Sequence, residues 1–163
     1  PHVRVQAGWA GVGANTVSLP LEHSFLSGGA NGIRGWRLRE LGPGNLNPDD
    51  ANFVVEGLGD LQVMLSLEWR SHWVSPWDLA WFVDAGNVWL HGDDAPAVTR
   101  WGDTGWGSVA AGSGLGIRYD FEVVVLRLDA GLRVHDPVQA EGQRWLGRGP
   151  WRGALHLGVG MPF

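Results

Sequence analysis

The residues with the clearest chemical potential are one arginine in a glycine-rich segment and two carboxylates in alternating segments. Clustered glycines over residues 27–37 permit backbone turns that other residues avoid, and they are expected to leave Arg34 and Trp36 on a tight tip. Asp84 lies on the polar side of a segment over 79–90, where a carboxylate shielded from water needs a partner. Arg34 is either a solvated arginine on a surface turn or folds back to bind Asp84 bidentately, with Glu68 sharing it.

Other candidate sites for chemistry are weak. The six histidines show no spacing typical of metal ligands, and no serine is framed as a nucleophile. The segment over 112–116 has the glycines of a phosphate loop but lacks its lysine and six-residue spacing. Close strand packing explains these glycines better. The sequence therefore predicts no catalytic residue, no metal, no cofactor and no enzymatic activity.

The elements that position Arg34, Glu68 and Asp84 are expected to be strands, because six stretches alternate apolar and polar residues. They cover about residues 3–13, 61–70, 79–90, 109–121, 124–134 and 155–163. Most last about as long as a tilted strand that crosses a membrane. In a membrane barrel the charged face lines the lumen and the apolar face meets lipid. We expect five residues to face lipid: Leu65, Val83, Ile117, Leu128 and Leu157.

The connections between these stretches alternate in length. Those over about 14–54, 91–107 and 135–152 are long, whereas those over about 71–78 and 121–123 are short. Outer-membrane barrels show this alternation, with long external loops and short periplasmic turns. Tryptophans cluster near the strand ends, where either aromatic girdles or ordinary packing accounts for them. They are Trp69, Trp73, Trp77, Trp81, Trp89, Trp101, Trp106 and Trp151.

Composition excludes several other classes of protein. The chain has 163 residues, 44% of them hydrophobic and 18% charged, with 26 glycines and no cysteine. These values argue against disorder, a disulfide framework and a thiolate zinc site. The net charge of −5 without a basic cluster argues against nucleic-acid binding. No apolar run has the length of a spanning helix, so contact with a membrane is expected through strands.

Several motifs follow one another along nearly the whole chain. The glycine-rich loop continues into Leu-Gly-Pro-Gly44, and the chain ends on Phe163. Between them stand Ser66-Leu-Glu-Trp-Arg70, Phe82-Val-Asp-Ala-Gly-Asn-Val-Trp89, Gly114-Leu-Gly-Ile-Arg-Tyr119 and Leu126-Arg-Leu-Asp-Ala-Gly131. In this order the motifs resemble the BamA/TamA outer-membrane assembly family of the bacterial surface antigen superfamily. The tryptophan-rich strands look most like the Bacteroidetes-type TamA-like branch.

The resemblance implies an all-β fold: a transmembrane antiparallel β-barrel of sixteen strands in the bacterial outer membrane. Residues 1–163 would supply its C-terminal six strands, without periplasmic POTRA repeats. The loop over about 14–54 would fold into the lumen and dock its tip on the wall. The expected lumen lock comprises Arg34, Gly35 and Trp36 on the loop, with Glu68 and Asp84 on the wall. Trp36 departs from the family, where Tyr or Phe is commoner, but stacking should survive.

The C-terminal stretch over 155–163 is apolar at every second position, on the side expected to face lipid. The resemblance implies that this stretch is the signal by which the barrel itself is assembled, carried by Leu155, Leu157, Val159, Met161 and Phe163. Gly158, Gly160 and Pro162 either weaken its pairing at a seam or mark a frayed terminus.

Three functions remain open at this level. The favoured one is a factor that helps insert or translocate other outer-membrane proteins. Its implied partners are outer-membrane lipid, unfolded outer-membrane protein clients and a periplasmic accessory subunit of the TamB type. The alternatives are a two-partner-type secretion pore, and a passive barrel or membrane anchor of a larger protein. A passive barrel gives no reason for Arg34 and Asp84 to occur together.

Overall fold

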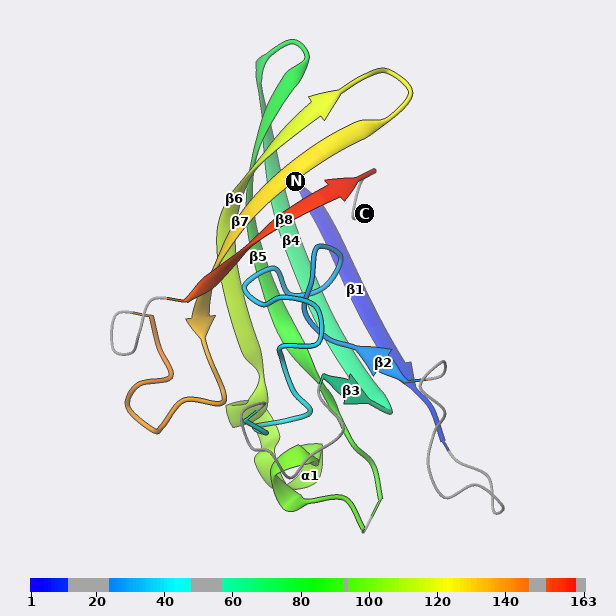
Figure 1. Ribbon diagram of the computed structural model, residues 1–163, viewed down its shortest axis with the longest axis vertical. Coiled ribbons are helices and arrows are strands. Elements are labelled where there is room, and N and C mark those ends of the chain that lie inside the picture. The colour runs from blue at the N-terminus through cyan, green and yellow to red at the C-terminus, as the bar shows by residue number, and fades with distance from the viewer. Residues whose placement is uncertain (12–23, 48–56, 93, 147–151, 161–163) are drawn as a thin grey trace.

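The computed structural model describes residues 1–11, 24–47, 57–92, 94–146 and 152–160, and one curved antiparallel sheet dominates it (Figure 1). The six strands of this sheet are neighbours in the order β1-β4-β5-β6-β7-β8. The sheet contains β1 (His2–Trp9), β4 (Leu61–Val74), β5 (Trp77–Trp89), β6 (Ala110–Asp120), β7 (Val125–His135) and β8 (Gly153–Val159). The six predicted strands are therefore confirmed, with shifted ends.

The strands alternate between a buried concave face and an exposed convex face, as the period of two requires. On β4 the polar Gln62, Ser66 and Glu68 are buried, whereas the apolar Leu65 and Leu67 between them are exposed. Leu65, Ile117, Leu128 and Leu157 are exposed on the convex face, and Val83 is half-buried opposite Leu67. The face predicted to meet lipid is thus apolar and outward, which is the reverse of a sheet in a soluble protein.

Short and long connections lie at opposite ends of the sheet (Figure 1). The turn between β4 and β5 is shorter than the predicted connection over 71–78, because both strands extend to residues 74 and 77. His72 and Asp78 face each other across this extension, with Nδ1 and Oδ1 2.9 Å apart. Of the C-terminal stretch, the structure describes β8, while Met161 and Phe163 lie outside the described residues.

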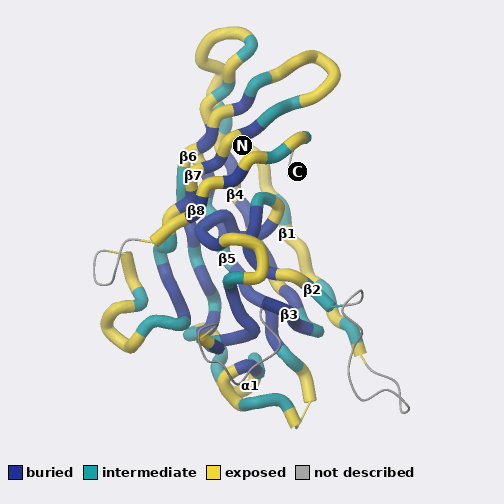
Figure 2. The backbone as a smooth tube through the Cα atoms, viewed as in Figure 1, coloured by how far each residue is buried: buried dark blue, intermediate teal, exposed yellow. Residues whose placement is uncertain are grey.

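The long connection after β1 packs on the concave face rather than extending away from the sheet (Figures 1 and 2). Its described residues, 24–47, begin with β2 (Phe25–Leu26), which pairs with β3 (Leu58–Gly59) in a separate small sheet. The buried apolar cluster combines loop and strand residues: Ile33, Trp36, Leu41, Met64 and Ala110. The loop therefore supplies the core that covers this face. Residues 14–23 and 48–54 of the predicted loop lie outside the described residues.

For Trp89, the structure decides between an aromatic girdle and ordinary packing in favour of packing. It is 1% exposed, and its Nε1 donates to Ser108 Oγ at 2.8 Å. The β5–β6 connection causes this burial, because its three short helices fold beside the end of β5. They bring the ring centroid of Trp101 to 4.9 Å from that of Trp89. They are η2 (Ala97–Thr99), α1 (Trp101–Thr104) and η3 (Gly105–Ser108). Among the described residues, no helix has the length and apolar character needed to cross a membrane.

The other tryptophans of that set divide differently. The side chains that remain exposed are Trp69, Trp73, Trp77, Trp81 and Trp106. Trp101 is half-buried, and Trp151 lies outside the described residues. The exposed members keep the amphipathic indole at the surface, as an aromatic girdle requires.

Asn87 joins two of the long connections to the end of β5. Its fully buried side chain donates from Nδ2 to the carbonyls of Gly44 at 2.8 Å and Ser108 at 2.7 Å. Its Oδ1 accepts from the backbone N–H of Val88 at 2.8 Å. A single amide side chain therefore satisfies three buried backbone groups from three segments.

We expect Asn87→Ala to lower the free energy of unfolding by about 2–4 kcal/mol, because it leaves two buried carbonyls without their donor. The measurement is the urea dependence of tryptophan fluorescence on the folded protein. The exposed Gln143→Ala is the matched control and should stay within about 0.5 kcal/mol of wild type. Equal stabilities of the two variants would contradict this role of Asn87.

Candidate functional site

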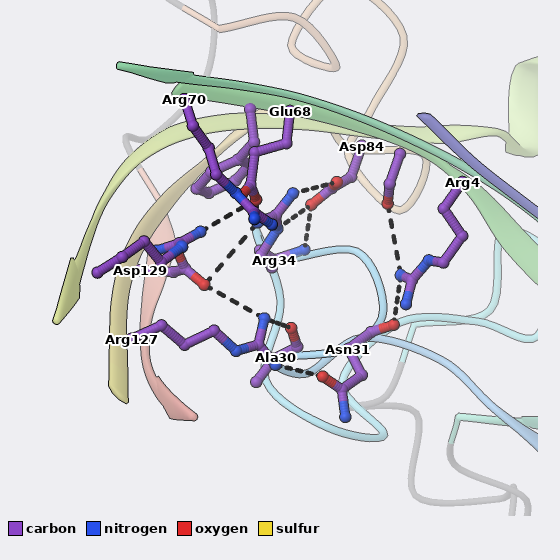
Figure 3. Close-up of polar contacts among 12 residues, drawn as sticks. Arg4, Ala30, Asn31, Arg34, Glu68, Arg70, Asp84, Arg127 and Asp129 are labelled. Carbon is purple, nitrogen blue, oxygen red and sulfur yellow. Dashed lines mark hydrogen bonds and ion pairs between the residues drawn. The ribbon is translucent and has the colours of Figure 1, made fainter. Parts of the chain in front are cut away.

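The loop tip, residues 28–36, turns tightly because of its glycines. Gly28 and Gly29 adopt φ values of +71° and +83°, and a side chain at Gly28 would clash with the carbonyl of Arg37. The N–H of Gly29 donates to the carbonyl of Trp36 at 2.9 Å, which closes the tip at its base. This geometry directs Arg34 toward the concave face of the sheet (Figure 3).

Arg34 binds both of the carboxylates that the sequence singled out. Its Nε and Nη2 donate to the two oxygens of Asp84 at 2.8 and 2.9 Å, and its Nη1 donates to Glu68 Oε2 at 2.6 Å. The backbone N–H of Arg34 adds a third bond to Asp84, at 3.1 Å. The exposed fractions of Arg34, Glu68 and Asp84 are 1%, 2% and 0%. The arrangement is a buried, bidentate ion pair rather than a solvated surface arginine.

The Arg34 guanidinium lies over an aromatic ring of β5, with its Cζ 3.6 Å from the centroid of Phe82. Burial disfavours the charged form, but the hydrogen bonds and charges of Asp84 and Glu68 outweigh it and raise the pKa of Arg34 above its ordinary value. Arg34 is therefore a permanent cation that is held in position by Asp84, Glu68 and Phe82.

Two further charged residues extend the pair into what we call the arginine cluster: Arg34, Glu68, Asp84, Arg118 and Asp129. Figure 3 shows Arg34 among Glu68, Asp84 and Asp129. Arg118 bridges the other two carboxylates, donating to Glu68 Oε2 at 3.0 Å and to Asp129 Oδ1 at 2.6 Å. Asp129 Oδ2 lies 3.8 Å from Arg34 Nη1. The cluster thus connects the loop to β4, β5, β6 and β7 through charged hydrogen bonds and ion pairs.

The backbone of the loop tip is bound as closely as its arginine. Arg127 Nη1 donates to the carbonyl of Ala30 at 2.9 Å, and Arg127 also binds the side-chain oxygen of Asn31. Arg4 of β1 donates to the carbonyl of Asn31 at 2.6 Å, and His156 of β8 lies 3.1 Å from the carbonyl of Arg34. These bonds bring the two outer strands of the sheet to the same short segment.

Glycines on the wall allow this close approach. A Cβ on Gly131 would clash with the carbonyl of Arg34, and one on Gly112 would lie 3.2 Å from the backbone nitrogen of Gly35. Gly35 itself is equally constrained, since its Cβ would lie 3.2 Å from the carbonyl of Leu132. An added Cβ at any of these glycines would therefore lie closer than an ordinary van der Waals contact. The loop and the wall thus pack with backbone against backbone.

Trp36 anchors the far side of the tip. Its buried ring belongs to the apolar cluster and lies under Arg133, whose Cζ is 4.9 Å from the ring. Arg133 in turn pairs with Glu40 of the loop at 2.5 Å and with Asp136 at 3.2 Å. Arg34, Gly35 and Trp36 therefore all contact the wall, each through a different interaction.

The C-terminal residues singled out in the sequence are placed apart from this cluster. Leu155, Leu157 and Val159 of β8 point to the convex face, where Leu157 is 77% exposed. Met161 and Phe163 lie outside the described residues. The described part of this stretch thus has an apolar outward side that no other described residue covers.

Several residues of the site are not among the five expected from the sequence in the lumen lock. Arg118 and Arg127 stand opposite each other on neighbouring strands, a like-charge pair that needs a carboxylate nearby, and Asp129 supplies it. The sequence would indicate this group of charges only if the register between the two strands were known. For Arg4 and His156 the alternation indicates the face but not the partner.

The described residues contain no group of histidines, cysteines and carboxylates able to hold a metal ion. The carboxylates of the arginine cluster are occupied by guanidinium groups, so the arrangement binds and orients a loop.

We expect Arg34→Ala and Asp84→Ala each to lower the free energy of unfolding by about 3–5 kcal/mol, because each leaves a buried charge without its partner. The double variant should lose less than the sum of the two, since the second change removes the stranded charge. Urea unfolding of purified protein measures both quantities. Arg37→Ala, an exposed arginine on the same loop, is the control and should stay within about 0.5 kcal/mol of wild type. Strict additivity of Arg34→Ala and Asp84→Ala would show that the pair is not energetically coupled.

A protein-family comparison agrees with this architecture. The Omp85 superfamily domain matches residues 2–148, a segment that includes β1 to β7, the loop tip and every member of the arginine cluster. Members of this superfamily are bacterial outer-membrane proteins that insert or translocate other proteins. They generally interact with outer-membrane protein clients and with accessory subunits. The match spans most of the chain, and the chain therefore belongs to the Omp85 superfamily.

Proposed function

We propose that this chain is the C-terminal part of a sixteen-stranded outer-membrane barrel that helps insert or translocate other outer-membrane proteins, without enzymatic activity. The observation that carries the proposal is the buried ion pair between the loop tip and the wall. Five carboxylate and guanidinium side chains hold the loop on the concave face. A passive barrel does not require such a loop, because a folded segment on this face narrows any lumen. An assembly factor needs a defined inner structure beside its strands.

The outward surface supports a membrane location for this barrel. The convex face is apolar, and exposed tryptophans lie toward the ends of its strands. Outer-membrane barrels carry an apolar band flanked by aromatic residues in this way. We propose outer-membrane lipid as the surrounding medium, unfolded outer-membrane proteins as clients, and a periplasmic accessory subunit of the TamB type as a partner. The tryptophan-rich strands favour the TamA-like branch over other branches.

We expect Arg34→Ala in the full-length protein to reduce the yield of folded client barrels by more than tenfold. Removing the bidentate partner of the buried Asp84 costs about 3–5 kcal/mol, and each 1.4 kcal/mol shifts the docking of the loop tenfold. The measurement is the amount of heat-modifiable, folded client protein in outer membranes, normalised to the folded variant. Arg37→Ala is the control and should keep the wild-type yield.

The same experiment separates the competing functions. Loss of a single exported protein, with other outer-membrane proteins intact, would identify a dedicated secretion pore. Wild-type yields of all clients in folded Arg34→Ala protein would contradict both transport functions and leave a passive barrel or membrane anchor.

A second prediction concerns the outward side of β8. Leu157→Arg places a charge on the exposed convex face, and a charge near the midplane of a membrane barrel costs about 2–4 kcal/mol. We expect it to reduce insertion of the protein itself, and deletion of Phe163 to do the same through loss of a recognition signal. The amount of heat-modifiable protein in outer-membrane fractions measures insertion. Val123→Arg, in the exposed β6–β7 turn, is the control and should insert normally. Wild-type insertion of both Leu157→Arg and the Phe163 deletion would refute this role.

A further inference from the structure

The last described strand, β8, is bonded to the loop tip through one side chain. His156 is 9% exposed, and its Nε2 lies 3.1 Å from the carbonyl oxygen of Arg34, which is 122 positions earlier in the chain. A carbonyl can only accept, so the Nε2 of His156 carries the hydrogen and donates it. The bond reaches the residue whose side chain holds Asp84 and Glu68.

The neighbours of His156 on the same face are small where the loop comes closest. Ala154 is opposite Gly131, against which the carbonyl of Arg34 rests. Gly158 is opposite Arg127, and a Cβ on Gly158 would clash with the Nε of that arginine. Arg127 in turn binds the loop carbonyl of Ala30. The inner face of β8 therefore bonds the loop tip directly at His156, and the small residues on either side of it face Gly131 and Arg127, two wall residues that contact the tip.

The close approach of Arg127 explains why position 158 is a glycine, without invoking weak pairing of the strand. Gly158 stands in register with Arg127 and leaves the space that the arginine side chain needs. Among the described residues, β8 has β7 as its one strand neighbour, and its Leu155, Leu157 and Val159 are exposed on the outward side. The bond from His156 to the carbonyl of Arg34 is thus a direct contact of β8 with the loop tip, in addition to its pairing with β7.

We propose that His156 is a positioning residue that couples the seating of the loop tip to the pairing of β8 with β7. When the loop tip is seated, the carbonyl of Arg34 fixes His156, and β8 pairs in the observed register. When the tip leaves, β8 loses this bond and the support of Arg127 beneath Gly158. The consequence for clients rests on the proposed assembly function, whereas the coupling itself is a property of the folded chain alone.

Amide hydrogen exchange of the full-length protein in detergent, followed by mass spectrometry of the peptide over β8, tests the coupling without any client. We expect His156→Leu to accelerate exchange in β8 about fivefold, the effect of losing one net hydrogen bond. His156→Gln, which keeps a donor at a similar reach, should stay within about twofold of wild type. His72→Leu, the same substitution at the exposed end of β4, should leave exchange in β8 unchanged. Wild-type exchange in His156→Leu overturns the proposal.

A second set of variants covers the case in which His156→Leu does not fold. Arg34→Ala should accelerate exchange in β8 although it changes no residue of that strand, and adding His156→Leu to it should accelerate exchange by less than twofold more. Unchanged β8 exchange in Arg34→Ala, or full additivity in the double variant, overturns the coupling.

The exchange measurement tests the coupling and the client measurement tests the assembly function, so either can be rejected without the other. Coupling in β8 with wild-type client yields in Arg34→Ala would retain this inference and reject the assembly function. Reduced client yields with unchanged β8 exchange would do the reverse.

Discussion

A guanidinium charge buried on the concave face of the sheet is the constraint on which the rest of this structure depends. Arg34 is 1% exposed, and an isolated charge in that position would be strongly destabilising. Asp84 and Glu68 remove that cost only because they hold the guanidinium at hydrogen-bond distance in the geometry it requires. The dependence is mutual, since both carboxylates are buried and bind Arg34, although Glu68 also accepts hydrogen bonds from Arg70 and Arg118.

The ion pair in turn determines how closely the main chain of the loop must approach the wall. Arg34 reaches Asp84 with its backbone N–H as well as its side chain, which leaves no room for a side chain between them. Gly112 and Gly131 of the wall provide the room, as Gly35 does on the loop. Glycines on the inner face of this sheet thus fit the loop, in addition to any role in strand packing.

Much of the fold follows from the sequence because strand alternation is a local property. The faces of β4, β6 and β7, and the outward direction of Leu128, need only a period of two. The partners of Arg34 could also be named, because a mid-strand carboxylate expected to be shielded requires a cation. Arg118 and Asp129 could not be assigned to the site, because their roles depend on the register between strands.

Trp89 and His156 mark a different limit. Alternation placed Trp89 on the outward face, but helices of the following connection cover it, and their position depends on Asn87 and on Ser108. The alternation of β8 puts His156 on the polar side, as the structure does, but its acceptor is a backbone carbonyl 122 positions away. Backbone acceptors leave no signature in residue type, so pattern analysis finds such a contact only after the chain has been placed in space.

The order of the loop and its wall along the chain has a kinetic consequence. The loop tip precedes all but one of the strands that bind it, and the contacts of Arg34 with the later strands span from 34 positions at Glu68 to 122 at His156. Contacts of such large sequence separation close slowly, because the entropy of a long loop is lost before the contact compensates for it. Arg34 has no complete binding surface until β8 has been synthesised and paired. Seating of the loop is therefore a late event in folding and reports that the last strand is in place.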